Sequence, residues 1–466
     1  MPSAIEDYAL IGDCEAAALI ARNGSIDWLC WPRFDSEACF AALLGSEEHG
    51  RWQICPVDEQ ARVSRRYRPN TLILETRFKC SDGDVVIIDF MPIHGSSQSH
   101  VVRLVAGERG RVAMRTELVI RFGFGAIVPW MTRMGEDMWR AIAGPDMLVI
   151  RTPVELTGEN MRTVGDFSVE AGETVPFVIT YSPSHLPPPE PLDPQKAIKA
   201  TETFWTDWCK QCRPAGHCSD AVLRSLITLK ALTYWPTGGI IAAPTTSLPE
   251  QLGGNRNWDY RFCWLRDATL TLLALMNAGF NDEAQAWREW LLRAVAGSPN
   301  QAQIMYGIAG ERRLAEWEVP WLPGYEGSQP VRIGNAAAGQ LQLDVFGEVM
   351  DALHQARCHG LAATESGWAV QRAFLDHLEE VWQKPDEGIW EVRGPPRQFT
   401  YSKMMAWLAF DRAIKSARRF DLEGPVEHWE KIHAPSTMMS ASAVSTKNWA
   451  ALSSPTNQRS WTPVFC

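Results

Sequence analysis

Four stretches of the chain combine tryptophan, carboxylates, arginine and asparagine next to predicted helix starts. They are residues 255–267, 311–318, 325–342 and 386–402. The hydroxyls of a neutral sugar are bound by charged or amide side chains that donate and accept in pairs, and the sugar ring packs on an aromatic face. The mixture therefore indicates recognition of a neutral carbohydrate by these stretches.

Other chemistries lack their motifs. The sequence has no Gly-x-Gly-x-x-Gly or Walker loop, no His-Glu-x-x-His and no Gly-x-Ser-x-Gly elbow. Cys209 and Cys212 have the Cys-x-x-Cys spacing that starts a zinc site, with His217 and Cys218 nearby, but a second pair at matching distance is absent. We expect buried or free thiols there, and neither a metal nor another cofactor.

The charge and the aromatic content narrow the possible functions further. The 55 acidic residues exceed the 45 basic ones, for a net charge of −10, and no Lys/Arg-rich run occurs, so we expect no nucleic-acid partner. The chain has 21 Trp against 8 Tyr, and 14 of the Trp lie between residues 200 and 430. Indoles serve as sugar platforms and as core fillers, so both roles stay open for any one of them.

The compartment is predicted from what the sequence lacks. Its start has no basic region followed by an apolar stretch, and no run approaches 18 apolar residues. The 11 cysteines are odd in number and scattered. We expect a cytoplasmic protein without a membrane partner, and the sequence carries no signal for an oligomeric state.

Residues 1–185 have the pattern of short strands. Asn23-Gly24 and Ser81-Asp82-Gly83 each separate two β-rich segments and predict hairpins. The predicted strands are 18–22, 25–31, 71–80, 84–91, 101–106, 112–120, 146–152 and 175–181. Pro176 would confine the last of them to a sheet edge. The pattern predicts an antiparallel β-sandwich.

After residue 185, the period of the hydrophobic pattern changes from two residues to 3.6 residues. Proline-rich residues 183–194 predict an interdomain linker, and residues 186–215 are expected to hold the linker with a helix. Helix-period segments follow at 221–234, 264–278, 283–296, 335–355, 368–383 and 402–417. Helices that alternate with aromatic loops predict a toroid of helix pairs with its site at the mouth.

Four long motifs in one order carry a family resemblance. They are DYALIGDCEAAALIARNGSIDWLCWPRFDS, NRNWDYRFCWLRDA, PVRIGNAAAGQLQLDVFGEV and GIWEVRGPPRQFTYSKMMAW. The chain resembles bacterial members of glycoside hydrolase family 15, with glucoamylase-like and trehalase-like enzymes, from about Ile5 to Ile432. The resemblance implies an N-terminal β-sandwich, a linker helix and an (α/α)₆ barrel, the last over residues 216–432.

The resemblance also implies an inverting, exo-acting hydrolase that releases glucose from α-glucans or α-linked disaccharides. One carboxylic acid protonates the leaving oxygen, and a carboxylate roughly 6.5–9.5 Å away activates water. By resemblance the acid is Glu391. The neighbouring Trp390 and Phe399 are expected to supply apolar surroundings that keep it protonated. An exposed loop carboxylate without such a role is the alternative.

Substrate contacts are implied at the other motifs. Arg266 and Asp267 match a pair that grips hydroxyls of the terminal glucose ring, with Trp264 beside them, and a surface ion pair is the alternative. The residues Asn257, Trp258, Asp259 and Tyr260 are expected to line the same pocket or to shape its loop.

Two further groups complete the predicted site. Glu316 and Glu318 bracket Trp317, and the two carboxylates are expected to point to one side. A substrate-subsite or loop-shaping role is expected for them, and Trp317 and Glu318 are counted among the predicted substrate contacts. Helix N-termini direct amides toward bound oxygens, so the aglycone side is assigned to Tyr325, Arg332, Asn335 and Gln342. A solvated helix face is expected for Asp344, Glu348 and Asp351.

The family pattern stops at about residue 433. Residues 433–466 are rich in Ser, Thr and Ala, and a reading frame shifted by two bases permits a string that resembles the next helix pair of the family. We therefore expect a frameshifted tail and an incomplete barrel, which resequencing of the gene would test. The resemblance places the general base in a later loop, so a catalytically dead remnant that binds sugar weakly is the alternative function.

Overall fold

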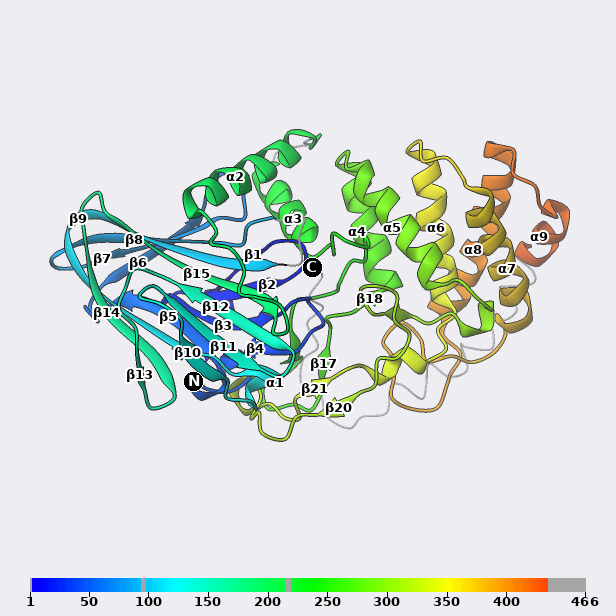
Figure 1. Ribbon diagram of the computed structural model, residues 1–466. Coiled ribbons are helices and arrows are strands. Elements are labelled where there is room, and N and C mark those ends of the chain that lie inside the picture. The colour runs from blue at the N-terminus through cyan, green and yellow to red at the C-terminus, as the bar shows by residue number, and fades with distance from the viewer. Residues whose placement is uncertain (1, 94–97, 214–218, 435–466) are drawn as a thin grey trace. The chain divides into compact units, whose positions relative to one another are not determined.

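The computed structural model describes residues 2–93, 98–213 and 219–434. The chain forms two compact units (Figure 1). Among the described residues, the first unit comprises 2–93, 98–213, 219–294 and 305–336, and the second comprises 295–304 and 337–434. The predicted domain boundaries at 185, 215 and 432 stay predictions, and residues 435–466 of the predicted frameshifted tail lie outside the described residues.

A large antiparallel sheet of 15 strands forms the N-terminal part of the first unit. Its path is β1-β2-β3-β5-β9-β15-β12-β11-β10, with the remaining strands paired beside it. The strands are β1 Tyr8–Gly12, β2 Ala17–Ala21, β3 Ser25–Cys30, β4 Ala38–Phe40, β5 Arg51–Pro56, β6 Arg62–Tyr67, β7 Leu74–Lys79, β8 Gly83–Phe90, β9 Ser99–Val119, β10 Trp130–Arg133, β11 Met138–Ala143, β12 Asp146–Arg151, β13 Thr157–Glu159, β14 Arg162–Glu170 and β15 Thr174–Pro183.

The predicted Asn23-Gly24 hairpin is confirmed, because β2 and β3 pair in antiparallel fashion. Gly24 has φ of +81°, and a Cβ there would lie 2.2 Å from the carbonyl oxygen of Ile54. Both the positive φ and the close approach of β5, which carries Ile54, therefore require glycine at this position.

The two strands predicted at 101–106 and 112–120 are wrong as separate elements, since β9 is one strand of 21 residues. Its first half pairs with β8 and β15, and its second half pairs with β14 and β5. Gly107 and Gly110 resemble a turn in sequence, but neighbours on both sides satisfy the backbone through this region. Long-range pairing overrides the local signal.

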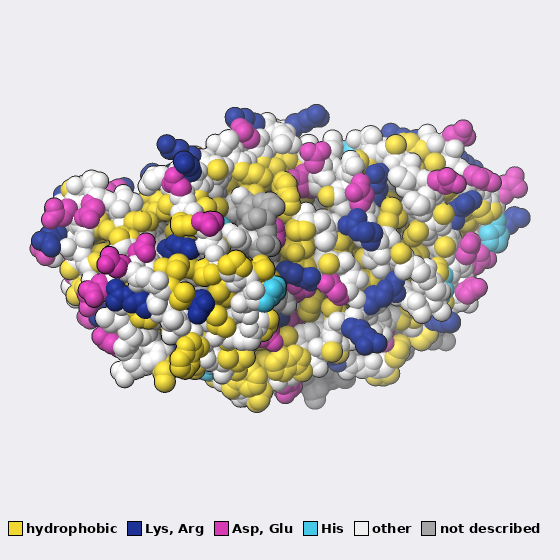
Figure 2. All heavy atoms as spheres, in the orientation of Figure 1, with side chains coloured by type: hydrophobic (Ala, Val, Ile, Leu, Met, Phe, Trp, Pro, Cys, Tyr) yellow, Lys and Arg dark blue, Asp and Glu magenta, His cyan; other side chains and the backbone are white. Residues whose placement is uncertain are grey.

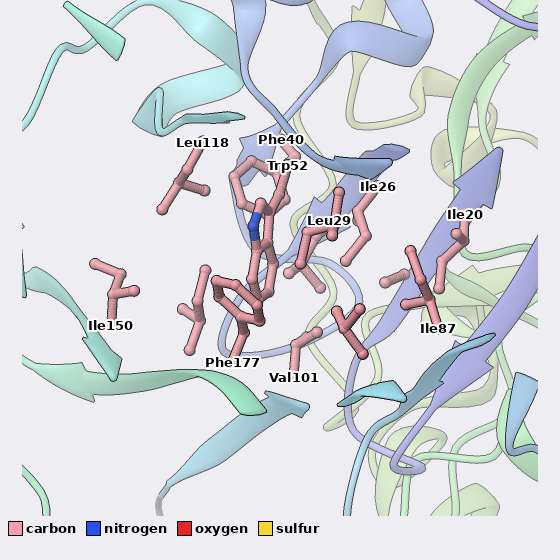
Figure 3. Packing of buried hydrophobic residues seen from close by; sticks show 14 of the residues in the cluster. Ile20, Ile26, Leu29, Phe40, Trp52, Ile87, Val101, Leu118, Ile150 and Phe177 are labelled. Carbon is pink, nitrogen blue, oxygen red and sulfur yellow. The ribbon is translucent and has the colours of Figure 1, made fainter. Parts of the chain in front are cut away.

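Side chains from both halves of β9 meet in one core. Figure 3 shows Trp52 of β5 beside Phe177 of β15, and their ring centroids lie 6.4 Å apart at 68°. Val101 on the first half of β9 and Leu118 on its second half join the same cluster, together with Ile87 of β8. The apolar faces of the two halves are thus buried against each other.

The prediction that the strand around Pro176 lies at a sheet edge is wrong. β15 has β9 on one side and β12 on the other. The pairing with β12 covers only Val178–Pro183, so Pro176 lies where β15 has a single neighbour. The missing N–H therefore costs no hydrogen bond to β12.

Helices follow the sheet. Those of the first unit are α2 Pro194–Lys210, α3 Ser219–Ala231, α4 Leu265–Asn277 and α5 Asn281–Ala294, and those of the second are α6 Asp344–Cys358, α7 Glu365–Val381, α8 Thr400–Phe420 and α9 Val426–His433. α2 covers one face of β8, β9 and β15 (Figure 1), where Ile198 packs on Phe90 and Val178. None of the helices in the described ranges is long and apolar enough to span a bilayer.

The helix predicted at 335–355 begins nine residues late. Asn335 N donates to the Leu314 carbonyl at 3.0 Å and Ala336 N donates to the Glu316 carboxylate at 3.0 Å, so loop contacts take the first amides of the predicted helix. A short 3₁₀ turn at Ala336–Gly339 precedes α6. The sequence pattern also missed α9.

The solvated face predicted on α6 is wrong for Asp344 and Glu348, whereas Asp351 is partly exposed. Asp344 is 0 % and Glu348 is 6 % exposed, because α6 packs against both α7 and α8. A Cβ on Gly347 would lie 2.2 Å from the Met405 carbonyl oxygen, so α8 approaches α6 more closely than any other residue would permit. Close approach of two helices buries charged positions that an isolated amphipathic helix would expose.

Surface charge is mixed. On the face shown in Figure 2, Lys and Arg side chains alternate with Asp and Glu, and neither sign forms a large patch. Such a surface offers no electrostatic track for a polyanion on that face.

Candidate active site

The loop that carries Glu391 joins α7 to α8 in the second unit. Asp386 N donates to the Arg397 carbonyl at 2.8 Å and Arg397 N donates to the Asp386 carbonyl at 2.7 Å, which closes the loop at its base. Glu391 lies near the tip with φ of +53°, a conformation that non-glycine residues rarely adopt. Strained backbone of this kind is concentrated at functional sites.

The expected apolar wall around Glu391 is only partly present. Phe399 packs on Gly388, where a Cβ would lie 2.7 Å from its ring. The indole of Trp390 is 77 % exposed, so it does not enclose Glu391, and that part of the expectation is wrong. Exposure instead leaves the indole face open for a ligand, so the substrate-binding role of Trp390 stays a prediction.

Asp259 and Arg261 form a fully buried ion pair in the first unit. Both side chains are 0 % exposed, and Arg261 Nε and Nη2 lie 2.9 and 2.7 Å from the two Asp259 oxygens. Arg261 Nη1 also donates to the Ser36 carbonyl at 2.6 Å, which joins the 255–267 stretch to the loop between β3 and β4. Burial alone would lower the pKa of Arg261, but the Asp259 carboxylate holds that pKa above its usual value.

The contacts in the structure divide the four residues predicted around the pocket into two groups. Asp259 is saturated by Arg261 and by Gly334 N at 3.0 Å, and the buried Asn257 donates to the Gly254 and Pro330 carbonyls at 3.1 and 3.2 Å. A loop-shaping role, the alternative left open by the sequence, therefore fits these two. Trp258 and Tyr260 are partly exposed and stay predicted substrate contacts.

Arg266 and Asp267 lie in the first turn of α4 and form an ion pair at 3.1 Å. Their side chains are 23 % and 43 % exposed, so a donor fork and an acceptor both remain open to solvent. Trp264 just before them is 2 % exposed and packs against Tyr260, with ring centroids 5.6 Å apart. Trp264 is thus a support behind the pair more than an open sugar platform.

The expectation that Glu316 and Glu318 point to one side is confirmed, because both contact Arg332. Arg332 Nε lies 3.8 Å from Glu316 and Nη2 lies 3.7 Å from Glu318. The Arg332 guanidinium also lies over the Trp258 ring, 4.6 Å from its centroid. Trp317 is 42 % exposed and lies 6.1 Å from Trp321, so this corner presents open indoles beside a carboxylate.

Tyr325 does not reach an aglycone, and that prediction is wrong. Its ring is buried in a cluster with Leu44 and Val319, and its hydroxyl donates to the Ser3 carbonyl at 3.1 Å. The cause is the packing of the loop against the N-terminal segment.

Several members of the predicted site are therefore placed, and others were missed. The predicted acid Glu391 belongs to the second unit, whereas Arg266 and Asp267 belong to the first unit. Sequence reasoning missed Arg261 and Asp386 as individual residues, since nothing in the local pattern says that either is fully buried. His217 and Cys218, weighed as metal ligands, lie outside the described residues.

Two protein families match consecutive parts of the chain. Residues 216–442 match the family Glycosyl hydrolases family 15, and residues 1–178 match the family Trehalase-like, N-terminal. The chain is 33 % identical to a trehalase of Mycolicibacterium smegmatis over 92 % of this chain and 68 % of that protein. It is 34 % identical to a trehalase of Mycobacterium tuberculosis over 92 % and 67 % of the two chains, and 32 % identical to a trehalase of Thermoplasma volcanium over 92 % and 69 %.

Proposed function

Because this chain belongs to family 15 of the glycosyl hydrolases, we propose that it is a hydrolase for α-linked glucose disaccharides of the trehalose type. The observation that carries the proposal is the likeness to three proteins named trehalase across 92 % of the chain. Release of glucose from α-glucans, the glucoamylase-like alternative, has no named relative in its favour here.

The proposed reaction is a single displacement. Glu391 protonates the glycosidic oxygen as it leaves C1, and a second carboxylate takes a proton from the water that attacks C1 on the opposite face. Glu391 is supported by its motif, by its backbone in the left-handed region and by a side chain that is neither buried nor fully exposed. No residue among those described is proposed as the base.

We propose that Arg266 and Asp267 clamp the terminal glucose ring, which would make the enzyme exo-acting. A guanidinium and a carboxylate side by side can donate to and accept from adjacent hydroxyls. The remaining contacts are assigned to Trp258, Tyr260, Trp317, Glu318 and Trp390, and the buried Trp264 is assigned to the support of the Arg266–Asp267 pair. The sandwich, the incomplete (α/α)₆ barrel and a cytoplasmic location belong to the same proposal.

The test uses the frame-restored enzyme, in which residues 1–432 continue in the shifted frame, beside the 466-residue polypeptide. Proton NMR of fresh products from trehalose separates the mechanisms. Inversion gives one β-glucose for each α-glucose, because the leaving sugar keeps its configuration, whereas retention gives only α-glucose at first. Turnover of trehalose above that of maltose supports the trehalose assignment, and the reverse order replaces it with a maltooligosaccharide.

The 466-residue polypeptide tests the second candidate. If it binds trehalose without hydrolysing it, as calorimetry would detect, the chain as printed is a sugar-binding remnant. Binding without hydrolysis and measurable hydrolysis exclude each other for this polypeptide, so any measurable release of glucose contradicts the remnant alternative.

Arg266→Ala is expected to lower kcat/KM by about 10- to 100-fold for trehalose, maltose and longer α-glucosides alike, because charged hydrogen bonds to the common ring are lost. The control is Arg109→Ala, which removes an exposed arginine paired with Asp84 at 3.0 Å and is expected to leave kcat/KM within about 2-fold. A loss confined to long substrates would move Arg266 to an outer subsite.

A further inference from the structure

Asp386 is a fully buried carboxylate at the base of the Glu391 loop. It is 0 % exposed, and its backbone makes both hydrogen bonds to Arg397 that close the loop. An unpaired carboxylate of this kind costs free energy unless its charge is compensated. The surroundings of Asp386 show where the compensation comes from.

The side chain of Asp386 reaches out of its own loop to α6. Its Oδ2 accepts a hydrogen bond from Leu343 N at 3.0 Å. Leu343 is the N-cap residue of α6 and provides no side-chain cap of its own. Asp386 thus caps α6 from another segment, and its negative charge faces the positive end of the helix dipole.

Neighbouring contacts extend this connection to Glu391. Leu341 N donates to the Glu387 carboxylate at 2.9 Å, and Glu387 N donates back to the Leu341 carbonyl at 3.1 Å. Gln340 Nε2 lies 3.4 Å from the backbone carbonyl of Glu391, within donating distance. Residues 340–343 therefore hold both the base and the tip of the loop.

A buried lysine lies on the other side. Lys403, 5 % exposed, donates to the carbonyls of Trp382 and Lys384 at 2.6 and 2.7 Å, just before the loop begins. Burial lowers the pKa of Lys403, and the negative charge of Asp386 opposes that effect. The second oxygen of Asp386, Oδ1, is buried without a hydrogen-bond partner among the described residues.

We propose that Asp386 is the positioning residue for Glu391: it fastens the base of the acid-bearing loop to the N-terminus of α6. The kinetic part of this inference rests on the proposed function, whereas the mechanical part does not. A carboxylic acid donates its proton well only from a defined position, and a displacement of about 1 Å can cost 10²-fold in rate. Asp386 acts through Glu391 and need not touch substrate.

The first test uses the 466-residue polypeptide and hydrogen exchange read by mass spectrometry. Asp386→Ala is expected to speed the exchange of peptides within 386–399 and at the start of α6 by at least about 10-fold. Asp386→Asn keeps an oxygen for Leu343 N and should restore much of the protection. The matched control is Thr364→Ala, which removes the cap that Thr364 Oγ1 gives Gly367 N at 3.1 Å on α7. Unchanged exchange at 386–399 in Asp386→Ala, or the same change in Thr364→Ala, overturns the proposal.

The second test uses the frame-restored enzyme and two substrates. Fluoride leaves from α-glucosyl fluoride with little need for a proton, whereas the sugar oxygen of trehalose needs one. Asp386→Ala is expected to lower kcat for trehalose by roughly 10- to 100-fold with KM little changed, and kcat for the fluoride by less than about 3-fold. Equal losses on both substrates would mean a general structural defect and would overturn the positioning role. If the unmutated enzyme hydrolyses neither substrate, the proposed function fails while the exchange test still decides the fastening.

Discussion

Glu391→Gln is expected to lower kcat for trehalose by roughly 10²–10⁴-fold in the frame-restored enzyme, the usual contribution of a positioned general acid. The amide has nearly the shape of the carboxylic acid but cannot transfer a proton to the leaving oxygen. KM should change little because the shape of the site survives. Steady-state glucose release from trehalose measures both constants.

The control for this variant is Glu379→Gln, on α7 in the same unit. Glu379 is exposed and pairs only with His428 at 2.9 Å among the described contacts, so we expect turnover within about 2-fold of the unmutated enzyme. The variant Glu391→Gln should also keep most of its activity on α-glucosyl fluoride, whose leaving group needs little help from an acid. Near-normal turnover of trehalose by Glu391→Gln would remove this residue from the acid role.

Arg261→Met is expected to lower the free energy of unfolding by about 3–5 kcal/mol, because it leaves the Asp259 carboxylate uncompensated in a fully buried place. The variant also loses the hydrogen bond from Arg261 to the Ser36 carbonyl in the loop between β3 and β4. Urea unfolding followed by tryptophan fluorescence measures the change, and Arg261 can be replaced in the 466-residue polypeptide.

Arg115→Ala is the matched control for that measurement. Arg115 lies 3.0 Å from Asp166, but the two side chains are 42 % and 68 % exposed, so water screens the pair and the change should stay under about 1 kcal/mol. If Arg261→Met were as stable as this control, the buried pair would carry none of the stability assigned to it. The double variant Arg261→Met/Asp259→Leu should be less destabilised than the sum of its parts, since no lone charge remains.

Local patterns predicted the elements whose signals lie within a few residues. The Asn23-Gly24 hairpin is specified by its own turn, and α4 by a 3.6-residue period that ends one residue from the predicted helix end. The same local reasoning failed for β9 and for the start of α6. In both places, residues far away in sequence supply hydrogen bonds that cannot be predicted from the local sequence pattern.

The candidate site divides in the same way. The motif GIWEVRG points to Glu391 through residue order alone, and the Arg-Asp pair at 266 and 267 is found by the same means, because chemical type and spacing are properties of the chain. The sequence by itself therefore determined the family, the strand-then-helix order and the residues proposed to act on the substrate.

Only the tertiary structure decided which charged groups are buried and what compensates them. The sequence placed Asp259 in a predicted pocket loop and did not single out Asp386, yet both are 0 % exposed, one against Arg261 and the other against the N-terminus of α6. Trp390 looks like an apolar wall and is 77 % exposed. The physical reason is that burial, and with it the cost or gain of a charge, depends on segments that pack from elsewhere in the chain, and no local pattern contains them.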